Sequence, residues 1–276
     1  MILKKQFQRL IKLFFHGKKT FFLLHQFEKK AFFCYLISGT NKPCRSLKKE
    51  YFSVSFTGDI DMETKTTKHF EELVQRVPSL GFLLPKFKQM TDKIVDLYKR
   101  DGILYIAGNG GSCCDSEHIV GELLKGFKRK RPFSQEEIRQ YKAFCGERGE
   151  YIASRLQKGL RAFSLNSHPG LNSAFANDVD GDLNYAQQLN AMGRKGDIFI
   201  GISTGGNASN IEAALITAKM MGVTTILLTG NKHGLCEKYA DIVIDAPAGE
   251  TYILQEYHLA IYHALCLEVE AAFFDI

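Results

Sequence analysis

The chain has 276 residues, of which 36 are lysine or arginine and 30 are aspartate or glutamate, giving a formal net charge of +6. This length suffices for one large or two modest domains with a sizeable core. Residues 1–61 hold 12 basic and four acidic residues, a net +8, whereas residues 62–276 hold 24 and 26, a net −2. The near-neutral main part gives no reason to expect a nucleic-acid partner.

The seven cysteines include no CxxC pair, and their number is odd. This pattern is typical of reduced thiols in a cytoplasmic protein rather than of a disulfide framework or a zinc ribbon. Cys113 and Cys114 are adjacent in a glycine-rich loop. We interpret them as small residues at a helix start, with a redox or nucleophilic pair as the alternative.

Residues 1–61 differ from the rest, since they contain ten of the 21 phenylalanines and no clean period. Their apolar runs are too short and too interrupted by charge to span a bilayer. No single apolar region leads to a small-residue cleavage site. A membrane-surface segment is an alternative, but we favour an extension outside the fold, with Met62 as the true start, and we expect no membrane partner.

From residue 62 the pattern becomes regular, and it predicts amphipathic helices over 64–77 and 86–100, broken near Pro78, Gly81 and Pro85. An apolar run at 103–107 then predicts a buried strand. Asn109, Gly110, Gly111 and Ser112 follow it and permit a tight turn.

A glycine turn that feeds a helix start exposes backbone N–H groups, which makes a phosphate site. On the helix predicted after this turn, His118 and Glu122 are four residues apart and share one face. The pair could hold a metal or act as acid and base, although such a pair is also common on solvated or core helix faces.

A helical insertion is predicted over 128–159. It starts with a basic run, Lys128 to Arg131, ahead of Pro132, which we interpret as a solvated helix end. Residues 134–158 are expected to form one or two polar helices, with Ser134 and Glu137 spaced as a capping box. Their polarity indicates an insertion or lid rather than a core element.

Four more apolar runs, at 161–165, 197–202, 224–229 and 241–245, predict further strands. Helical stretches separate them at about 170–192 (broken near 178–181), 207–221 and 233–240, and a long helix is predicted over 250–271. Strands that alternate with helices imply an α/β fold with a parallel sheet covered on both faces.

A second glycine loop, from Gly201 to Asn207, follows the strand at 197–202 and includes Ser203 and Thr204. In open α/β sheets, ligands bind outside the carboxyl ends of the strands, so both loops should face one crevice. Two such loops together favour a phosphorylated ligand.

The last predicted helix carries Gln255 and His263, eight residues apart and nearly on one face, whereas His258 points elsewhere. The default interpretation of either histidine is a buried ring with a hydrogen-bond partner. Together with His118 and Glu122, however, Gln255 and His263 form a mixed nitrogen and oxygen set that suits zinc or a similar divalent metal.

The sequence resembles the bacterial phosphoheptose isomerases, which are sugar-isomerase-domain (SIS) proteins, over about residues 62–274. The matching motifs are Gly108 to Ser112, His118 with Glu122, Ala176-Asn177-Asp178, Gly201 to Thr204, and Gln255 to His258 with His263. The resemblance implies a three-layer sandwich with a five-stranded parallel sheet, and a cytoplasmic homotetramer with sites at subunit interfaces. It also implies one zinc ion per subunit on His118, Glu122, Gln255 and His263.

The implied reaction converts sedoheptulose 7-phosphate to D-glycero-D-manno-heptose 7-phosphate through an enediol, for lipopolysaccharide, capsule or another glycoconjugate. Glu122 would be the base and His263 the acid. The implied substrate-binding set is Asn109, Gly110, Gly111, Ser112, Asn177, Asp178, Ser203, Thr204, Asn207 and Gln255.

Two positions depart from the family pattern, because Gly205 and Ala208 stand where the family usually has serine. The loss of two hydroxyl donors could weaken or alter phosphate binding. Two alternatives therefore stay open. One is a non-catalytic SIS protein that binds a phosphosugar or a protein partner, and the other is an SIS enzyme for a different phosphosugar.

Overall fold

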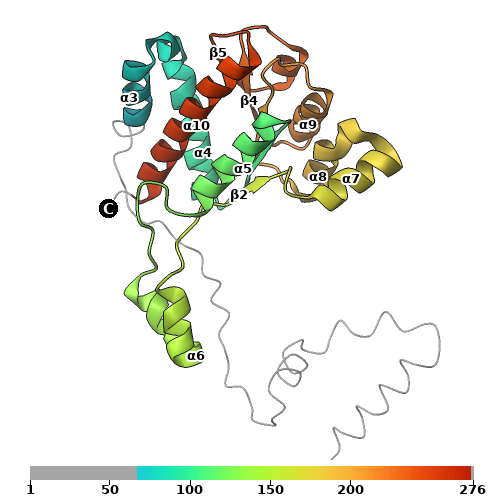
Figure 1. Ribbon diagram of the computed structural model, residues 1–276. Helices are drawn as coiled ribbons and strands as arrows, with labels where there is room; N and C mark the ends of the chain where they lie inside the picture. The colour runs from blue at the N-terminus through green and yellow to red at the C-terminus, as the bar shows by residue number, and fades with distance from the viewer. Residues whose placement is uncertain (1–66, 275–276) are drawn as a thin grey trace, which may run out of the picture. The chain divides into compact units, whose positions relative to one another are not determined.

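Five parallel strands form the centre of the computed structural model, which describes residues 67–274 (Figure 1). The strands are β1 (Leu104–Gly108), β2 (Ala162–Ser164), β3 (Ile198–Ile202), β4 (Thr224–Gly230) and β5 (Ile242–Ala246). Their order in the sheet is β2-β1-β3-β4-β5, and every neighbouring pair is parallel. This confirms the predicted five-stranded α/β sheet.

The strands form from apolar runs because both faces of the sheet are covered. Successive residues of a strand point to opposite faces. On β1, Ile106 contributes to one core cluster and Tyr105 to the other, and β3 repeats the division with Ile200 and Phe199. The two clusters are the two interfaces between the sheet and its helical layers.

The first helical layer packs on the cluster that contains Ile106. It consists of α3 (Lys68–Arg76), α4 (Leu84–Lys99), α5 (Gly111–Leu124) and α10 (Thr251–Phe274). The second layer packs on the cluster that contains Tyr105, through α8 (Asn184–Met192) and α9 (Ser209–Met220). The result is the expected three-layer sandwich.

The predicted breaks in the helices are short 3-10 or π-helical segments. The break at 78–85 is the 3-10 helix η1 (Pro78–Leu83), and Pro85 lies in the first turn of α4, where its missing N–H costs nothing. After α7 (Pro169–Phe175), a π-helical turn, η2 (Ala176–Asp180), and a 3-10 turn, η3 (Gly181–Leu183), form the break near 178–181. The stretch expected at 233–240 is the 3-10 helix η4 (Leu235–Tyr239).

The predicted insertion is a helical hairpin, α6 (Gln135–Ala153), that extends away from the layers (Figure 1). Ser134 and Glu137 form the predicted capping box, and the chain reverses at Cys145 and Gly146, whose dihedrals are not helical. An antiparallel bridge between Pro132 and Gln157 joins the two ends of the hairpin.

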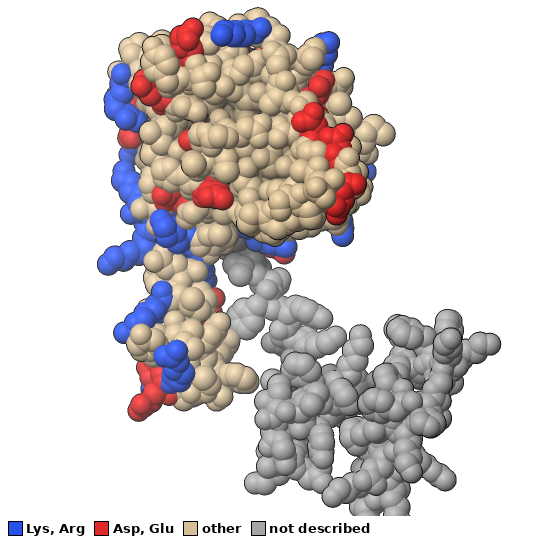
Figure 2. Space-filling model, turned by 45° about the vertical axis from the view of Figure 1, so that its right-hand side comes forward, with Lys and Arg blue, Asp and Glu red and all other residues tan. Residues whose placement is uncertain are grey.

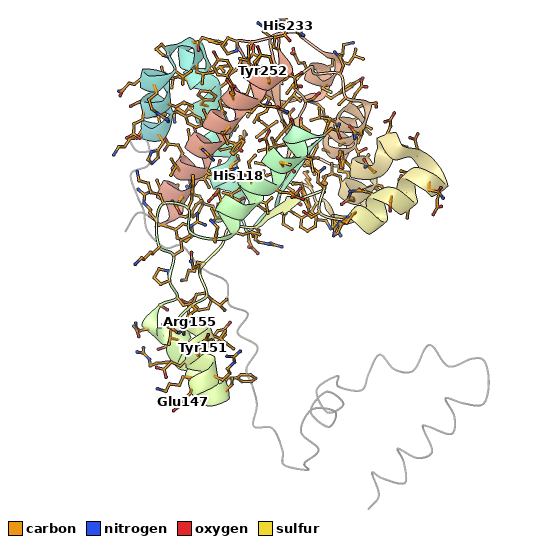
Figure 3. The ribbon with its side chains drawn as sticks, viewed as in Figure 1. His118, Glu147, Tyr151, Arg155, His233 and Tyr252 are labelled. Atoms are coloured by element: carbon orange, nitrogen blue, oxygen red, sulfur yellow. The ribbon has the colours of Figure 1, made fainter. Side chains whose placement is uncertain are left out.

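Aromatic side chains of this hairpin are exposed at its surface. Phe144 is 90% exposed, and Tyr151 is flanked by the guanidinium groups of Arg148 and Arg155, 5.0 and 3.8 Å from its ring centroid. Figure 3 shows Tyr151 and Arg155 on the hairpin. The hairpin thus lies outside the core, as predicted.

Charged side chains on the face shown in Figure 2 lie mainly along its edges, and the middle of that face is largely uncharged. Within the part of the chain that the structure describes, no helix has the length and apolar character needed to cross a bilayer. The prediction for residues 1–61 lies outside the described residues.

Candidate active site

The first glycine loop connects β1 to α5 and has the predicted turn. Gly110 has a φ of +57°, a left-handed conformation that favours glycine, and α5 begins at the next residue. The loop is closed by the N–H of Ser112, which donates to the carbonyl of Asn109 at 3.0 Å. The N–H of Cys113 likewise donates to the carbonyl of Gly110 at 3.1 Å, so the first turn of α5 is bonded to the loop at the carboxyl end of β1.

Asn109 is held by its neighbours. Its side-chain amide exchanges two hydrogen bonds, of 2.8 and 2.9 Å, with the amide of Asn210 at the start of α9. The hydroxyl of Tyr185 donates to Asn109 Oδ1 and to the carbonyl of Gly108. Because Asn210 follows the second glycine loop, these contacts bring the two predicted loops together at one edge of the sheet.

The second loop connects β3 to α9. Gly206 has a φ of +66°, and its N–H donates to the carbonyl of Ser203. Asn207 stabilises the loop, because its Oδ1 accepts the N–H of Leu235 and its Nδ2 donates to the carbonyl of Gly205, both at 2.9 Å. The sequence predicts that Asn207 contacts the substrate. In the structure, its side-chain amide is hydrogen-bonded to Gly205 and Leu235.

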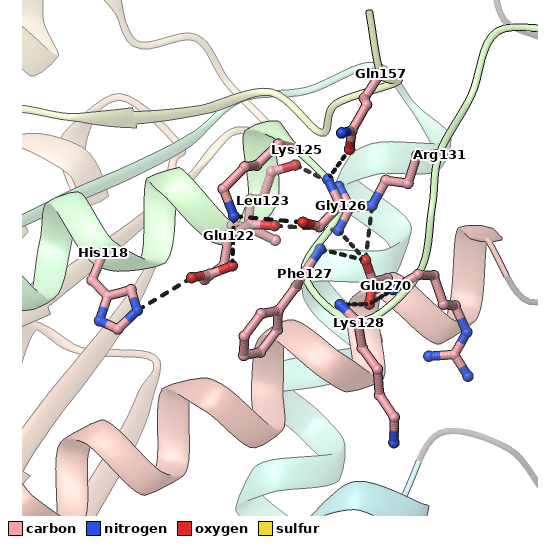
Figure 4. Close-up of polar contacts among 11 residues, drawn as sticks. His118, Glu122, Leu123, Lys125, Gly126, Phe127, Lys128, Arg131, Gln157 and Glu270 are labelled. Atoms are coloured by element: carbon pink, nitrogen blue, oxygen red, sulfur yellow. Dashed lines mark hydrogen bonds and ion pairs between the residues drawn. The ribbon is translucent and has the colours of Figure 1, made fainter. Parts of the chain in front are cut away.

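The predicted pair on α5 is in contact. His118 Nε2 lies 3.2 Å from Glu122 Oε1, and Lys125 Nζ lies 3.2 Å from the other carboxylate oxygen (Figure 4). The side chain of Glu122 is 13% exposed and that of His118 is 41% exposed. The pair is therefore reachable by a small molecule, while Glu122 is largely shielded from solvent.

His263, on α10, completes a cluster of three. Its ring centroid lies 5.0 Å from that of His118 and 5.5 Å from that of Phe127. Burial lowers the pKa of His263, and the neighbouring His118 adds to this effect, so the ring is held in its neutral form near pH 7. Among the described residues, His263 Nε2 has no hydrogen-bond partner although it is buried.

Sequence reasoning missed two residues that orient His118. The hydroxyl of Tyr262 lies 2.9 Å from His118 Nδ1 and donates to Asp115 Oδ1 at 3.2 Å. Asp115 stands only three residues before His118, but its contact with Tyr262 joins positions 147 residues apart. Only the placement of Asp115 on the helix face of His118 could have indicated this contact.

Gln255, the fourth predicted metal ligand, lies at the start of α10 against Gly111, where an added Cβ would come 2.3 Å from its Nε2. It is eight residues, or about 12 Å along the helix, from His263. Within the described residues, no three or more His, Cys, Asp or Glu side chains stand in a metal-binding arrangement. The zinc site remains a prediction.

Asn177 and Asp178 lie on the exposed π-helical turn η2. Asn177 Nδ2 donates to Asp178 Oδ1 at 2.9 Å, so the two side chains contact each other rather than the His118 cluster. His258 has the default role of a buried histidine, since its Nε2 lies 3.2 Å from the carbonyl of Thr229.

The prediction that the basic run from Lys128 to Arg131 is a solvated helix end is wrong for Arg131. The helix α5 ends at Leu124, and Arg131 is buried in an ion pair of 2.9 Å with Glu270 (Figure 4). Sequence reasoning also missed Glu270, although a carboxylate in the apolar stretch that ends α10 requires a partner if it is buried.

Comparison with known proteins agrees with this geometry. A family model described as the SIS domain matches residues 173–269. A phosphoheptose isomerase of Leptospira biflexa is 36% identical over 202 residues, which are 73% of this chain and 90% of that protein. Another, of Sulfurimonas denitrificans, is 32% identical over 203 residues, 74% of this chain and 91% of that protein.

Two solved structures share the fold. They are phosphoheptose isomerases of Neisseria gonorrhoeae, with a TM-score of 0.57, and Francisella tularensis, with a TM-score of 0.58. Each is 24% identical to this chain and matches 74% of it, which corresponds to 96% and 95% of the respective solved chain.

Proposed function

The chain belongs to the phosphoheptose isomerase family, and we propose that it interconverts sedoheptulose 7-phosphate and D-glycero-D-manno-heptose 7-phosphate. The observation that carries this proposal is the cluster of Glu122, His118 and His263, formed where α5 packs beside α10. The helix that carries Glu122 begins at a glycine loop suited to phosphate.

The isomerisation moves a proton between C1 and C2 of the sugar through an enediol. Glu122 is suited to remove and return this proton, because its carboxylate is shielded and fixed by His118 and Lys125. His263 is suited to move protons between the sugar hydroxyl groups. A neutral imidazole donates from one ring nitrogen and accepts at the other, and His263 Nε2 has no partner among the described residues.

The phosphate is proposed to bind at the two glycine loops. The positive end of the α5 dipole and the hydroxyl groups of Ser112, Ser203 and Thr204 would contact the phosphate, whereas the N–H groups of Ser112 and Cys113 donate to the carbonyls of Asn109 and Gly110. The link between Asn109 and Asn210 supports this proposal, since it holds the two loops against each other.

The chemical types of the donors in the candidate site also suit zinc, although the described side chains do not stand in a metal-binding arrangement. His118 and His263 supply two imidazoles, Glu122 supplies a carboxylate, and Gln255 supplies an amide oxygen. The Nε2 atom of His263 is buried and has no partner among the described residues. When bound, a divalent ion would act as a Lewis acid on the sugar carbonyl. Glu122 would then need to serve as ligand, as base, or as both in turn, and His263 Nε2 could not bind the ion and accept a proton at the same time.

The assembly and the setting are proposed from the family resemblance and the cysteine pattern. We expect a cytoplasmic homotetramer that supplies heptose for lipopolysaccharide, capsule or another glycoconjugate. Sedimentation of the full chain checks the assembly, because a tetramer and a monomer differ fourfold in mass.

Turnover of sedoheptulose 7-phosphate by the full chain, with and without added zinc, tests the proposed function. Formation of the heptose 7-phosphate supports it, and dependence on zinc supports the metal site. If a folded, zinc-treated chain gives no product, a panel of other phosphosugars separates the two alternatives. Turnover of another sugar indicates a different isomerase, and binding without turnover indicates a non-catalytic SIS protein.

A further inference from the structure

A buried ion pair lies beside the candidate active site without contacting the reacting groups. Arg131 Nη2 lies 2.9 Å from Glu270 Oε1, and both side chains have no solvent exposure. Arg131 Nε donates to the same oxygen at 3.0 Å. Figure 4 shows the pair next to the end of α5.

Glu270 holds the turn that follows α5. Its carboxylate accepts the backbone N–H groups of Phe127, Lys128 and Arg129 at 2.9, 2.9 and 3.1 Å. With the guanidinium of Arg131, these donors satisfy both carboxylate oxygens and hold the pKa of Glu270 below its ordinary value despite burial. The turn is therefore attached to α10.

Arg131 holds the end of α5 itself. Its Nη1 donates to the carbonyl of Leu123 at 2.7 Å, and its Nη2 donates to the carbonyl of Glu122 at 3.2 Å. The last carbonyls of a helix have no partner within the helix, so Arg131 satisfies two of them with a buried charge. One of the two belongs to the proposed base.

These contacts connect the two helices that carry the chemistry. Glu122 lies in the last turn of α5, and His263 lies on α10, two turns before Glu270. Phe127, whose N–H is held by Glu270, places its ring 5.5 Å from His263. We propose that Arg131 and Glu270 are positioning residues, which fix the separation of Glu122 and His263; this inference rests on the proposed isomerase function.

The same helix provides a comparison. Glu268 is also buried, and its carboxylate accepts the backbone N–H groups of His69 and Phe70 at the start of α3. Both glutamates thus accept backbone N–H groups of a neighbouring segment, but Glu268 has no arginine partner among the described residues and attaches α3, which carries no residue of the candidate site. Glu268→Gln is therefore the matched control for Glu270→Gln.

The test measures kcat and KM for sedoheptulose 7-phosphate with the full chain and both variants. Misplacement of a catalytic group by about 1 Å can lower the rate about a hundredfold. We expect Glu270→Gln to lower kcat about ten- to a hundredfold with KM changed less than threefold, and Glu268→Gln to leave kcat within twofold. Equal kcat in the two variants would overturn the inference.

A second variant covers the case in which Glu270→Gln fails to fold. Arg131→Lys keeps the buried charge balanced, but a lysine cannot reach the carboxylate and two carbonyls at once. We expect it to fold and to lower kcat at least tenfold; a wild-type kcat would overturn the inference. If the wild type itself gives no product, the proposed function fails, whereas an active wild type with unaffected variants contradicts only the positioning role.

Discussion

The hydroxyl oxygen of Tyr262 lies 2.9 Å from Nδ1 of His118, on the side of the ring opposite to Glu122. Tyr262 in turn donates to Asp115. Burial raises the pKa of both groups, and at Asp115 the hydrogen bond from Tyr262 opposes this rise. A contact at one ring nitrogen fixes the ring plane and the tautomer, so the other nitrogen is presented to Glu122 and to any metal.

The first prediction concerns Tyr262→Phe. Removing a group that is hydrogen-bonded to a metal-binding histidine typically lowers metal affinity 10- to 100-fold. We expect the loss of the Tyr262 hydroxyl to weaken zinc binding by a factor in this range. Competition with a chromophoric chelator measures the affinity without any substrate. The control is Tyr98→Phe, because the buried hydroxyl of Tyr98 has no partner among the described residues. Equal zinc affinity in the two variants would contradict the role of Tyr262.

The second prediction concerns Glu122→Gln. The amide keeps the shape of the side chain but cannot accept the carbon-bound proton, so turnover should fall at least a thousandfold, in line with the loss of a general base and its electrostatic contribution. The thermal midpoint should change by only a few degrees. Glu117→Gln, on the exposed face of the same helix, should be fully active. Undiminished turnover by Glu122→Gln removes Glu122 from the mechanism.

The third prediction concerns Gly205, one of the two departures from the family pattern. A Cβ at this position meets no atom within 4 Å, so Gly205→Ser is accommodated. A hydrogen bond to a charged group contributes roughly 1.5–3 kcal/mol. If the new hydroxyl reaches the phosphate, KM should fall about tenfold or more with kcat little changed.

The control for this variant is Gly206→Ser. Gly206 has a left-handed backbone, and an added Cβ would come 3.0 Å from the backbone of Gly234. This substitution should destabilise the loop and lower the thermal midpoint. An unchanged KM for Gly205→Ser would indicate that the phosphate lies away from position 205.

The fourth prediction concerns pH and Glu268. Burial raises the pKa of Glu268 from 4.5 to about 7, and Glu71 and Glu72 add to the shift. Between these values the folded chain keeps a proton that the unfolded chain releases, so the free energy of unfolding falls as pH rises through this window. Glu268→Gln removes the titration.

The wild type should lose up to about 3 kcal/mol relative to Glu268→Gln as the pH rises from 4.5 to 7. Urea unfolding at a series of pH values measures this difference. Parallel stability curves for the two proteins would show that Glu268 titrates normally in the folded chain.

The sequence predicted the elements of the fold well because the relevant signals are local. Apolar runs and glycine loops located all five strands, and the spacing of His118 and Glu122 gave a contact within one helix. Long-range polar contacts have no such signal. Arg131 and Glu270 are 139 residues apart, and a basic run before a proline has the same composition whether it is solvated or buried.

The candidate site was predicted in part for the same reason. His118, Glu122 and His263 come together as expected, whereas Asn177 and Asp178 pair with each other on an exposed turn. Asn207 stabilises its own loop. A residue type and its spacing indicate what a side chain can bind, but the packing of the helices decides which partner it meets.

The two ends of the α6 hairpin adjoin each other, through the bridge of Pro132 to Gln157 and the N–H of Gly126, which donates to Gln157 Oε1 at 2.7 Å. Closing this gap with a short turn needs no movement of β1 or β2, and lengthening it costs little loop entropy. The hairpin can therefore be lengthened, replaced or removed by one insertion or deletion without altering the sheet. A change of length here leaves His118, Glu122 and His263 in place, since none of them lies on the hairpin.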